Sequence, residues 1–233
     1  MNKHFLLSLK EYASVHASLK RCIETSPDKP IVFFEVGCMD GSLSGGFYSM
    51  VMQNGRSDNR YFAFEPYSRN YIKITKNPNF PANAEVVNKA LNSKTGVFDL
   101  FCSSGKTKGN PNEYEGCSSL LEPQEVTVKF PFIKFNSTEP VECITIDDFC
   151  KEKHIDAIDF VYADIQGAEG DMITGAQEMM NNIKFMFLEK SDIALYKNQP
   201  LTKDLIAIME TNGFEVAKEF KYDILFYNKN IIK

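Results

Sequence analysis

The sequence predicts an α/β fold in which helices cover both faces of a mostly parallel central sheet. Two patterns support this prediction: apolar runs alternate with helical segments, and several of the runs end in an acidic residue. A strand with helices on both faces is a continuous run of β-branched and aromatic residues, because neither face meets water. The alternation of such runs with helices is typical of a parallel sheet.

The first hundred residues contain four predicted strands. Residues 5–24 repeat apolar side chains at three- and four-residue spacing, which predicts a helix within an N-terminal extension covering residues 1–26. Helices are also expected at 47–53 and 68–75. Apolar runs predict strands at 31–36, 61–65, 84–90 and 97–102, with the last two side by side.

Residues 103–140 break the alternation. This segment holds glycines, prolines and many polar residues, and we expect a loop-rich insertion that lies over a ligand crevice. A short helix then begins near Ile146, with an aspartate as its N-cap. Strands are expected at 141–146, 158–164 and 185–189, helices at 170–181 and 201–211, and a closing antiparallel pair at 214–217 and 222–227. The whole chain, 1–233, is expected to form a single domain.

Composition excludes some classes of protein. The 233 residues carry a formal net charge of −5, and such an acidic surface does not attract nucleic acid or anionic membranes. No run approaches the roughly 18 apolar residues that a membrane-spanning helix needs. The six cysteines form no CxxC pair and no zinc pattern, which indicates reduced thiols. We therefore expect a cytoplasmic protein with no membrane span and no nucleic-acid partner.

Acidic residues stand at or near the ends of four predicted strands. Glu65, Asp164 and Glu189 each close one strand, and Glu35 lies just before the turn at Gly37. Ligands of open α/β sheets bind at the carboxyl ends of the strands. We therefore expect these carboxylates to surround one ligand site.

The loop that follows the first strand has the pattern Glu35-x-Gly37-x-x-x-Gly41. Gly37 can adopt a positive φ and let the backbone approach a ligand closely. The loop lacks the GxGxxG of a dinucleotide site and the Gly-Lys-Ser/Thr of a P-loop. Glu65 lies 28 residues after Gly37 and can accept hydrogen bonds from the hydroxyls of a ribose, as an acidic residue does in dinucleotide sites. Together, the loop and Glu65 predict a nucleoside ligand.

Five ordered segments give the chain a specific resemblance. They are the glycine loop 34–41, Phe64-Glu65-Pro66, Asn88-Lys89-Ala90-Leu91, Thr145-Ile146-Asp147-Asp148-Phe149 and residues 159–169. In this order they resemble the FkbM family of S-adenosylmethionine-dependent methyltransferases. The resemblance implies the class I, Rossmann-like methyltransferase fold and S-adenosyl-L-methionine as the cofactor. One departure is Gln166, which stands where the family often has glutamate.

The resemblance also implies roles for individual residues. The loop after the first strand would shape the methionine end of the cofactor pocket, Glu65 would hold the ribose, and residues 88–90 would border the adenine. Ser119 and Ser118 resemble a Ser-Ser element that would approach the cofactor or the acceptor. The predicted cofactor-binding residues are Glu35, Gly37, Asp40, Gly41, Glu65, Asn88, Ala90 and Ser119.

Methyl transfer requires mainly that the acceptor lies in line with the methyl group. A hydroxyl acceptor has a high pKa, so a base that removes its proton assists the reaction. We predict Asp164 as this base or as the group that orients the acceptor, with Glu189 as the second candidate. Glu169 better fits a charge that stabilises a helix N-terminus. Carboxylates suit Mg²⁺, but the sequence does not require a metal and we predict none.

The predicted activity is O-methylation of a hydroxyl on a small-molecule or glycan acceptor such as a sugar, because the family mostly methylates oxygen. Two alternatives stay open: methylation of nitrogen or of nucleic acid, and a non-catalytic module that binds S-adenosylmethionine. The absence of an Asn/Asp-Pro-Pro-Tyr/Phe motif and the acidic net charge disfavour methylation of nucleic-acid bases. The sequence leaves the oligomeric state open.

Overall fold

The computed structural model describes residues 19–20, 23–24, 29–106 and 115–232. The helix predicted at 5–24 and the extension predicted at 1–26 therefore lie mostly outside the described residues. Of this region, Leu19 and Ile23 are described, and both side chains are buried in an apolar cluster on one face of the main sheet.

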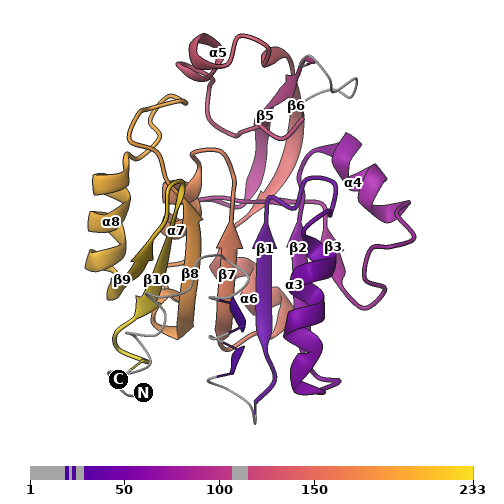
Figure 1. Cartoon of the computed structure of the whole chain (residues 1–233), viewed down its shortest axis with the longest axis vertical. Helices are drawn as coiled ribbons and strands as arrows, with labels where there is room; N and C mark the ends of the chain where they lie inside the picture. Colours follow the sequence, from indigo (N-terminus) through magenta and orange to yellow (C-terminus); the bar gives the residue numbers. More distant parts are fainter. Residues whose placement is uncertain (1–18, 21–22, 25–28, 107–114, 233) are drawn as a thin grey trace.

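A seven-stranded sheet runs through the middle of the molecule (Figure 1). Its strand order is β3-β2-β1-β7-β8-β10-β9, and all neighbours from β3 to β8 pair in parallel. β10 runs antiparallel to both of its neighbours. The strands are β1 (Val32–Val36), β2 (Arg60–Phe64), β3 (Glu85–Val87), β7 (Ile158–Ala163), β8 (Ile183–Glu189), β9 (Phe214–Glu219) and β10 (Asp223–Asn228). This topology confirms the predicted class I, Rossmann-like fold with an antiparallel strand near the C-terminus.

Two helical layers cover the faces of this sheet. In β1, Phe33 belongs to one apolar cluster and Phe34 to the other, because successive side chains of a strand point to opposite faces. Phe149 packs edge-on against Phe34, with the ring centroids 5.5 Å apart. One layer contains α6 (Ile146–Lys153), α7 (Glu169–Thr174), η2 (Met180–Asn182) and α8 (Thr202–Thr211). The other contains α3 (Ser44–Val51), η1 (Met52–Asn54) and α4 (Ser68–Thr75).

A second, three-stranded sheet stands above the carboxyl ends of the parallel strands (Figure 1). It has the order β4-β6-β5 and consists of β4 (Ala90–Leu91), β5 (Gly96–Ser104) and β6 (Lys134–Ile144). The strand predicted at 84–90 therefore splits into β3 and β4, which belong to different sheets. The predicted pairing of 97–102 with that strand is wrong, because β5 pairs antiparallel with β6.

The segment 103–140, predicted to be loop-rich, is only partly irregular. β5 extends to Ser104, α5 covers Val126–Lys129, and β6 begins at Lys134. The first half of β6 is largely exposed, so it lacks the apolar run by which a buried strand is predicted. Residues within 115–120 and 126–133 of this segment contribute to the cavities described below.

Two details of the helices differ from the prediction. α7 ends at Thr174 rather than at 181, and a Cβ on the next residue, Gly175, would lie 2.1 Å from the carbonyl oxygen of Asn92. The N-cap of α6 is Thr145 rather than an aspartate, and its hydroxyl accepts a hydrogen bond from the Asp148 N–H at 2.9 Å. The predicted closing antiparallel pair is confirmed by β9 and β10.

Two further expectations concern the environment of the protein. In the part of the chain that the structure describes, no helix is long and apolar enough to span a membrane. The cysteines of that part are free thiols in buried positions, as predicted. They are Cys38, Cys102, Cys117, Cys143 and Cys150.

Candidate active site

Two adjoining cavities lie at the carboxyl edge of the main sheet. The first, here called the inner pocket, encloses about 580 Å³ with its open mouth included, among Gly37, Glu65, Ala90, Leu100 and Ser119. The second, here called the outer cavity, encloses about 2620 Å³ on the same basis, among Lys129, Phe130, Glu189, Tyr196 and Tyr222. The residues that line both cavities are Met39, Glu115, Gly116, Asp164 and Gln166. These shared residues mark where a ligand of one cavity meets a ligand of the other.

Gly37 brings the backbone to the inner pocket directly after β1. Its φ is +82°, and a Cβ at this position would lie 2.1 Å from the Asp164 carbonyl oxygen. Its N–H donates to the Phe64 carbonyl oxygen at 3.0 Å. The loop is therefore held between the ends of β2 and β7, and only glycine fits there.

Gly41 and Asp40 complete the loop without lining the inner pocket. Gly41 has a φ of +74°, and a Cβ on it would contact the Phe80 ring at 2.8 Å. Asp40 Oδ1 accepts a hydrogen bond from the Ser42 N–H at 3.0 Å, and Asp40 lines the outer cavity. Both residues shape the turn, and neither residue lines the inner pocket.

Glu35 lies behind the loop rather than in the inner pocket. Its carboxylate is buried on the α3 side of the sheet, where it accepts hydrogen bonds from the Ser44 and Tyr61 hydroxyls, each at 2.6 Å. Burial raises the pKa of Glu35 to about 7, against the effect of these two hydrogen bonds. The residue thus fastens β1 to α3, and its predicted place at the methionine end of the cofactor is corrected accordingly.

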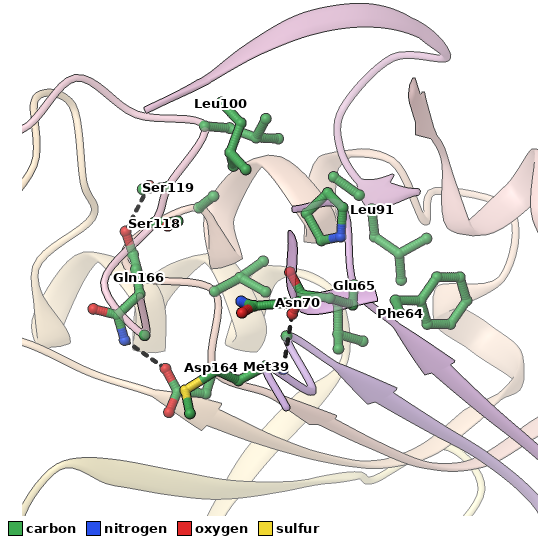
Figure 2. Close-up of a pocket in the computed structure, with 18 of the residues that line it drawn as sticks. Met39, Phe64, Glu65, Asn70, Leu91, Leu100, Ser118, Ser119, Asp164 and Gln166 are labelled. Carbon is green, nitrogen blue, oxygen red and sulfur yellow. Dashed lines mark hydrogen bonds between the residues drawn. The ribbon is translucent and has the colours of Figure 1, made fainter. Parts of the chain in front are cut away.

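Glu65 lies just after β2 and faces the inner pocket (Figure 2). Its Oε2 accepts a hydrogen bond from the Met39 N–H at 2.8 Å, and its Oε1 accepts one from the Tyr67 N–H at 2.9 Å. The side chain of Asn70 also acts to lower the pKa of this carboxyl group. Burial nevertheless raises the pKa of Glu65 to about 8. A ligand with hydrogen-bond donors would therefore favour the ionised form of Glu65.

Ala90 and Asn88 follow β3 but take different positions. Ala90 lines the inner pocket together with Leu91 and Leu100, which gives the pocket an apolar wall. Asn88 points elsewhere, because its side-chain amide donates to the carbonyl oxygens of Glu65 and Pro66, at 2.8 and 3.2 Å. Asn88 supports the turn after β2 and does not line the inner pocket, so its predicted contact with adenine is corrected.

Ser119 lies at the inner pocket, and its hydroxyl forms hydrogen bonds with other residues of the protein. The hydroxyl donates to the Gln166 carbonyl oxygen at 2.9 Å and accepts a hydrogen bond from the Leu121 N–H at 3.0 Å. Ser118 likewise donates to the Glu115 carbonyl oxygen at 3.0 Å. Ser119 therefore joins segment 115–121 to Gln166 after β7 (Figure 2), whereas Ser118 bonds within its own segment.

Asp164 and Glu189 end β7 and β8, and the side chain of Gln166 bridges them. Gln166 Nε2 donates to Asp164 Oδ1 at 2.6 Å and to Glu189 Oε2 at 3.3 Å. Burial raises the pKa of both carboxyl groups, and the charge of Asp164 adds to the effect on Glu189, whose pKa reaches about 10. At neutral pH, Glu189 thus favours its protonated form.

Glu169 begins α7 behind this pair. Its Oε1 accepts a hydrogen bond from the Ile165 N–H at 3.0 Å, and burial raises its pKa to about 8. Glu169 lines neither cavity, so its position agrees with the expected role at a helix N-terminus rather than with catalysis.

Several residues of the site carry no sequence signal. Tyr196 donates from its hydroxyl to the Cys117 carbonyl oxygen at 2.8 Å and lies 3.3 Å from Gln166 Oε1. Glu115 is buried at the boundary of the two cavities, where it forms ion pairs with Arg69 and Lys73. Arg69 and Lys73 come from α4, whereas Glu115 and Tyr196 come from connecting segments. None of these residues lies in a sequence motif. For Gln166 the only signal was its departure from the family pattern.

The comparisons with known proteins agree with this geometry. A sequence model described as the methyltransferase FkbM domain matches residues 35–216. The chain belongs to this family. The FkbM methyltransferase described here is also similar to a protein named 2-O-methyltransferase NoeI from Sinorhizobium fredii. The identity is 27% over 221 residues, which cover 93% of this chain and 86% of that protein.

Solved structures of low sequence identity also resemble this FkbM methyltransferase. Fibrillarin from Aeropyrum pernix, in complex with natively bound S-adenosyl-L-methionine, has 11% identity and a TM-score of 0.44, over 97% of this chain and 73% of that one. A protein described as a pericyclic reaction enzyme has 8% identity and a TM-score of 0.45, and the chain spans 52% of its length. The fold assignment rests on the strand order and not on these scores.

The inner pocket suits S-adenosyl-L-methionine, the cofactor of this FkbM methyltransferase. The absence of a Cβ on Gly37 lets the loop after β1 pass close to Asp164 at the pocket, Ala90 and Leu100 offer an apolar wall to the adenine, and Glu65 offers a carboxylate to the ribose. When bound, the cofactor supplies a methyl group activated by a positively charged sulfur. No group of His, Cys, Asp and Glu side chains among the described residues is arranged to hold a metal ion.

Proposed function

We propose that this FkbM methyltransferase transfers the methyl group to a hydroxyl of a sugar, a glycan or a related small molecule. The observation that carries the proposal is the pair of carboxyl groups, Asp164 and Glu189, bridged by Gln166 at the boundary of the two cavities. Asp164 lines both cavities, so a hydroxyl that enters the outer cavity can approach it on the side of the inner pocket.

The two carboxyl groups have different tasks in this proposal. Glu189 keeps its proton at neutral pH, because burial and the charge of Asp164 raise its pKa to about 10. Asp164, in its ionised form, removes the proton from the acceptor hydroxyl as methyl transfer proceeds. Gln166 holds Asp164 in position through the 2.6 Å hydrogen bond. The proton then leaves Asp164 for solvent through the outer cavity.

The outer cavity supports a carbohydrate acceptor. Phe130 and Tyr222 line it and are 41% and 61% exposed, and the charged side chains of Lys129 and Asp192 line it as well. A sugar has apolar ring faces and hydroxyl edges, so a cavity with aromatic rings and polar groups can bind both. The name of the relative NoeI, a 2-O-methyltransferase, supports oxygen as the target atom.

A screen with S-adenosylmethionine carrying a labelled methyl group tests the proposal. The acceptors would be monosaccharides, oligosaccharides and small alcohols, with matched amines, DNA and RNA for comparison. We expect label on hydroxyl acceptors. Label on amines or nucleic acid alone would replace O-methylation with the corresponding alternative. Cofactor binding without transfer to any acceptor would point to a non-catalytic module.

A further inference from the structure

Two buried side-chain oxygens among the described residues have no hydrogen-bond partner: Asn70 Oδ1 and Thr202 Oγ1. A buried polar atom without a partner destabilises a protein unless a ligand supplies one. Thr202 begins α8, and it lies outside the linings of both cavities. Asn70 is 2% exposed and lines the inner pocket. Of the two, Asn70 Oδ1 is therefore the oxygen that a ligand can reach.

The surroundings of Asn70 indicate which part of a ligand it meets. Asn70 stands on α4, and Figure 2 shows its side chain beside Glu65 among the residues of the inner pocket. Its side chain lies close enough to the Glu65 carboxyl group to lower the pKa of that group against the effect of burial. The carbonyl oxygen of the Asn70 side-chain amide remains without a donor. A donor that reaches Glu65 from the ligand thus comes close to Asn70 Oδ1 as well.

The capacity of Glu65 to accept hydrogen bonds is limited. An ionised carboxylate has about four acceptor positions on its two oxygens. Two protein donors already use it: the Met39 N–H and the Tyr67 N–H, one on each oxygen. A ribose presents two hydroxyl donors. Asn70 Oδ1, which has no partner, is a further acceptor beside Glu65 for one of these hydroxyls.

We propose that Asn70 Oδ1 accepts a hydrogen bond from one ribose hydroxyl of the cofactor, while Glu65 accepts one from the other. Asn70 is then a cofactor-binding residue that the sequence motifs do not mark. The proposal rests on the inner pocket being the cofactor site, and it is independent of the acceptor in the outer cavity.

Calorimetry with S-adenosylhomocysteine and its 2′-deoxy and 3′-deoxy analogues tests the proposal. Asn70→Thr shortens the side chain by one bond, so no acceptor remains at the position of the Asn70 carbonyl oxygen. We expect this variant to bind S-adenosylhomocysteine about tenfold more weakly, since one hydrogen bond is lost. In the wild type, one deoxy analogue should lose affinity by a similar factor. In the variant, removal of the same hydroxyl should change the affinity less than about threefold.

Equal penalties for that analogue in the wild type and in Asn70→Thr would overturn the proposal, as would unchanged affinity of the variant for S-adenosylhomocysteine. Thr202→Val is the matched control, because it removes the other unpartnered oxygen and should leave the affinity unchanged.

Thermal melting checks that each variant is folded. If Asn70→Thr does not fold, a crystal structure of the wild type with S-adenosylhomocysteine decides. A distance above 4 Å from Asn70 Oδ1 to both ribose hydroxyls would refute the contact. Absence of any binding by the wild type would instead refute the assignment of the inner pocket.

Discussion

The inner pocket and the outer cavity share a boundary but are built differently. The inner pocket is formed at the ends of β1, β2 and β7, and backbone N–H groups bind both oxygens of its carboxylate, Glu65. The outer cavity is formed largely by connecting segments, residues 129–133 and 189–199, and by exposed aromatic and charged side chains. The cofactor side thus depends on the geometry of the main sheet, whereas the acceptor side can change without disturbing that sheet.

The largest effect is expected where the backbone itself forms the inner pocket. In Gly37→Ala the new Cβ would lie 2.1 Å from the Asp164 carbonyl oxygen, on a residue with positive φ. The ends of β1 and β7 must then separate, so we expect at least 100-fold weaker binding of S-adenosylhomocysteine and a loss of stability of about 3 kcal/mol. Calorimetry and urea unfolding measure the two effects.

Gly45→Ala is the matched control for this change. Gly45 lies in α3, and no atom lies within 4 Å of a Cβ placed on it. Alanine favours a helix over glycine, so this variant should be as stable as the wild type or more stable. Equal changes in cofactor affinity and in stability for Gly37→Ala and Gly45→Ala would contradict the view that the sheet geometry determines the inner pocket.

A substitution at the boundary between the cavities should change the rate of methyl transfer rather than the affinity for the cofactor. Asp164→Asn keeps the shape of the side chain but removes the base, so we expect methyl transfer to slow by about 100-fold or more. The affinity for S-adenosylhomocysteine should change less than threefold. Single-turnover rates with a hydroxyl acceptor from the screen measure the effect on methyl transfer, and calorimetry measures the effect on affinity for S-adenosylhomocysteine. A variant with full activity would remove Asp164 as the base.

The protein without cofactor should lose stability as the pH rises from 5 to 8. Burial raises the pKa from the ordinary value of 4.5 to about 7 for Glu35, about 8 for Glu65 and about 8 for Glu169. The folded protein therefore holds more protons than the unfolded chain in this range. Stability is full below pH 4.5 and falls through the folded pKa values, by up to about 1.4 kcal/mol per pH unit for each group.

Urea unfolding at several pH values measures this dependence, and Glu65→Gln provides the comparison. The variant lacks one of the titrating groups, so its stability should fall less steeply with pH. A stability that rises between pH 5 and 8 would show that these carboxyl groups are ionised in the folded protein.

The smallest effect is expected in the outer cavity. Phe130→Ala removes an exposed ring that lines this cavity but leaves the inner pocket untouched. We expect the KM for a carbohydrate acceptor to rise by about three- to tenfold, with unchanged affinity for S-adenosylhomocysteine. Val128→Ala is the control, because Val128 is on the short helix α5 that Phe130 directly follows, is 68% exposed and does not line the cavity. Weaker cofactor binding by Phe130→Ala would show that the two cavities are not independent.

The sequence predicted the parts of the site that depend on local chemistry. Gly37 and Glu65 follow strands whose apolar runs are plain, and they lie at the inner pocket as expected. Glu35 was misplaced because alternation along β1 turns its side chain to the α3 face, together with Phe33. Asn88 was misplaced because its amide bonds to the neighbouring backbone, which no motif reveals. Tyr196 reaches the site only through the tertiary fold, so no local pattern could predict it.

The hydrogen bonds and burial of Glu65 have a thermochemical consequence. In the empty pocket at pH 7 this carboxyl group is largely protonated, since its pKa is about 8. Hydroxyl donors from a ribose favour the ionised form, so cofactor binding must expel a proton into the medium. The heat of binding should therefore depend on the buffer that takes up this proton. It should be more exothermic in Tris than in phosphate, because protonation of Tris releases more heat, and Glu65→Gln should remove the difference.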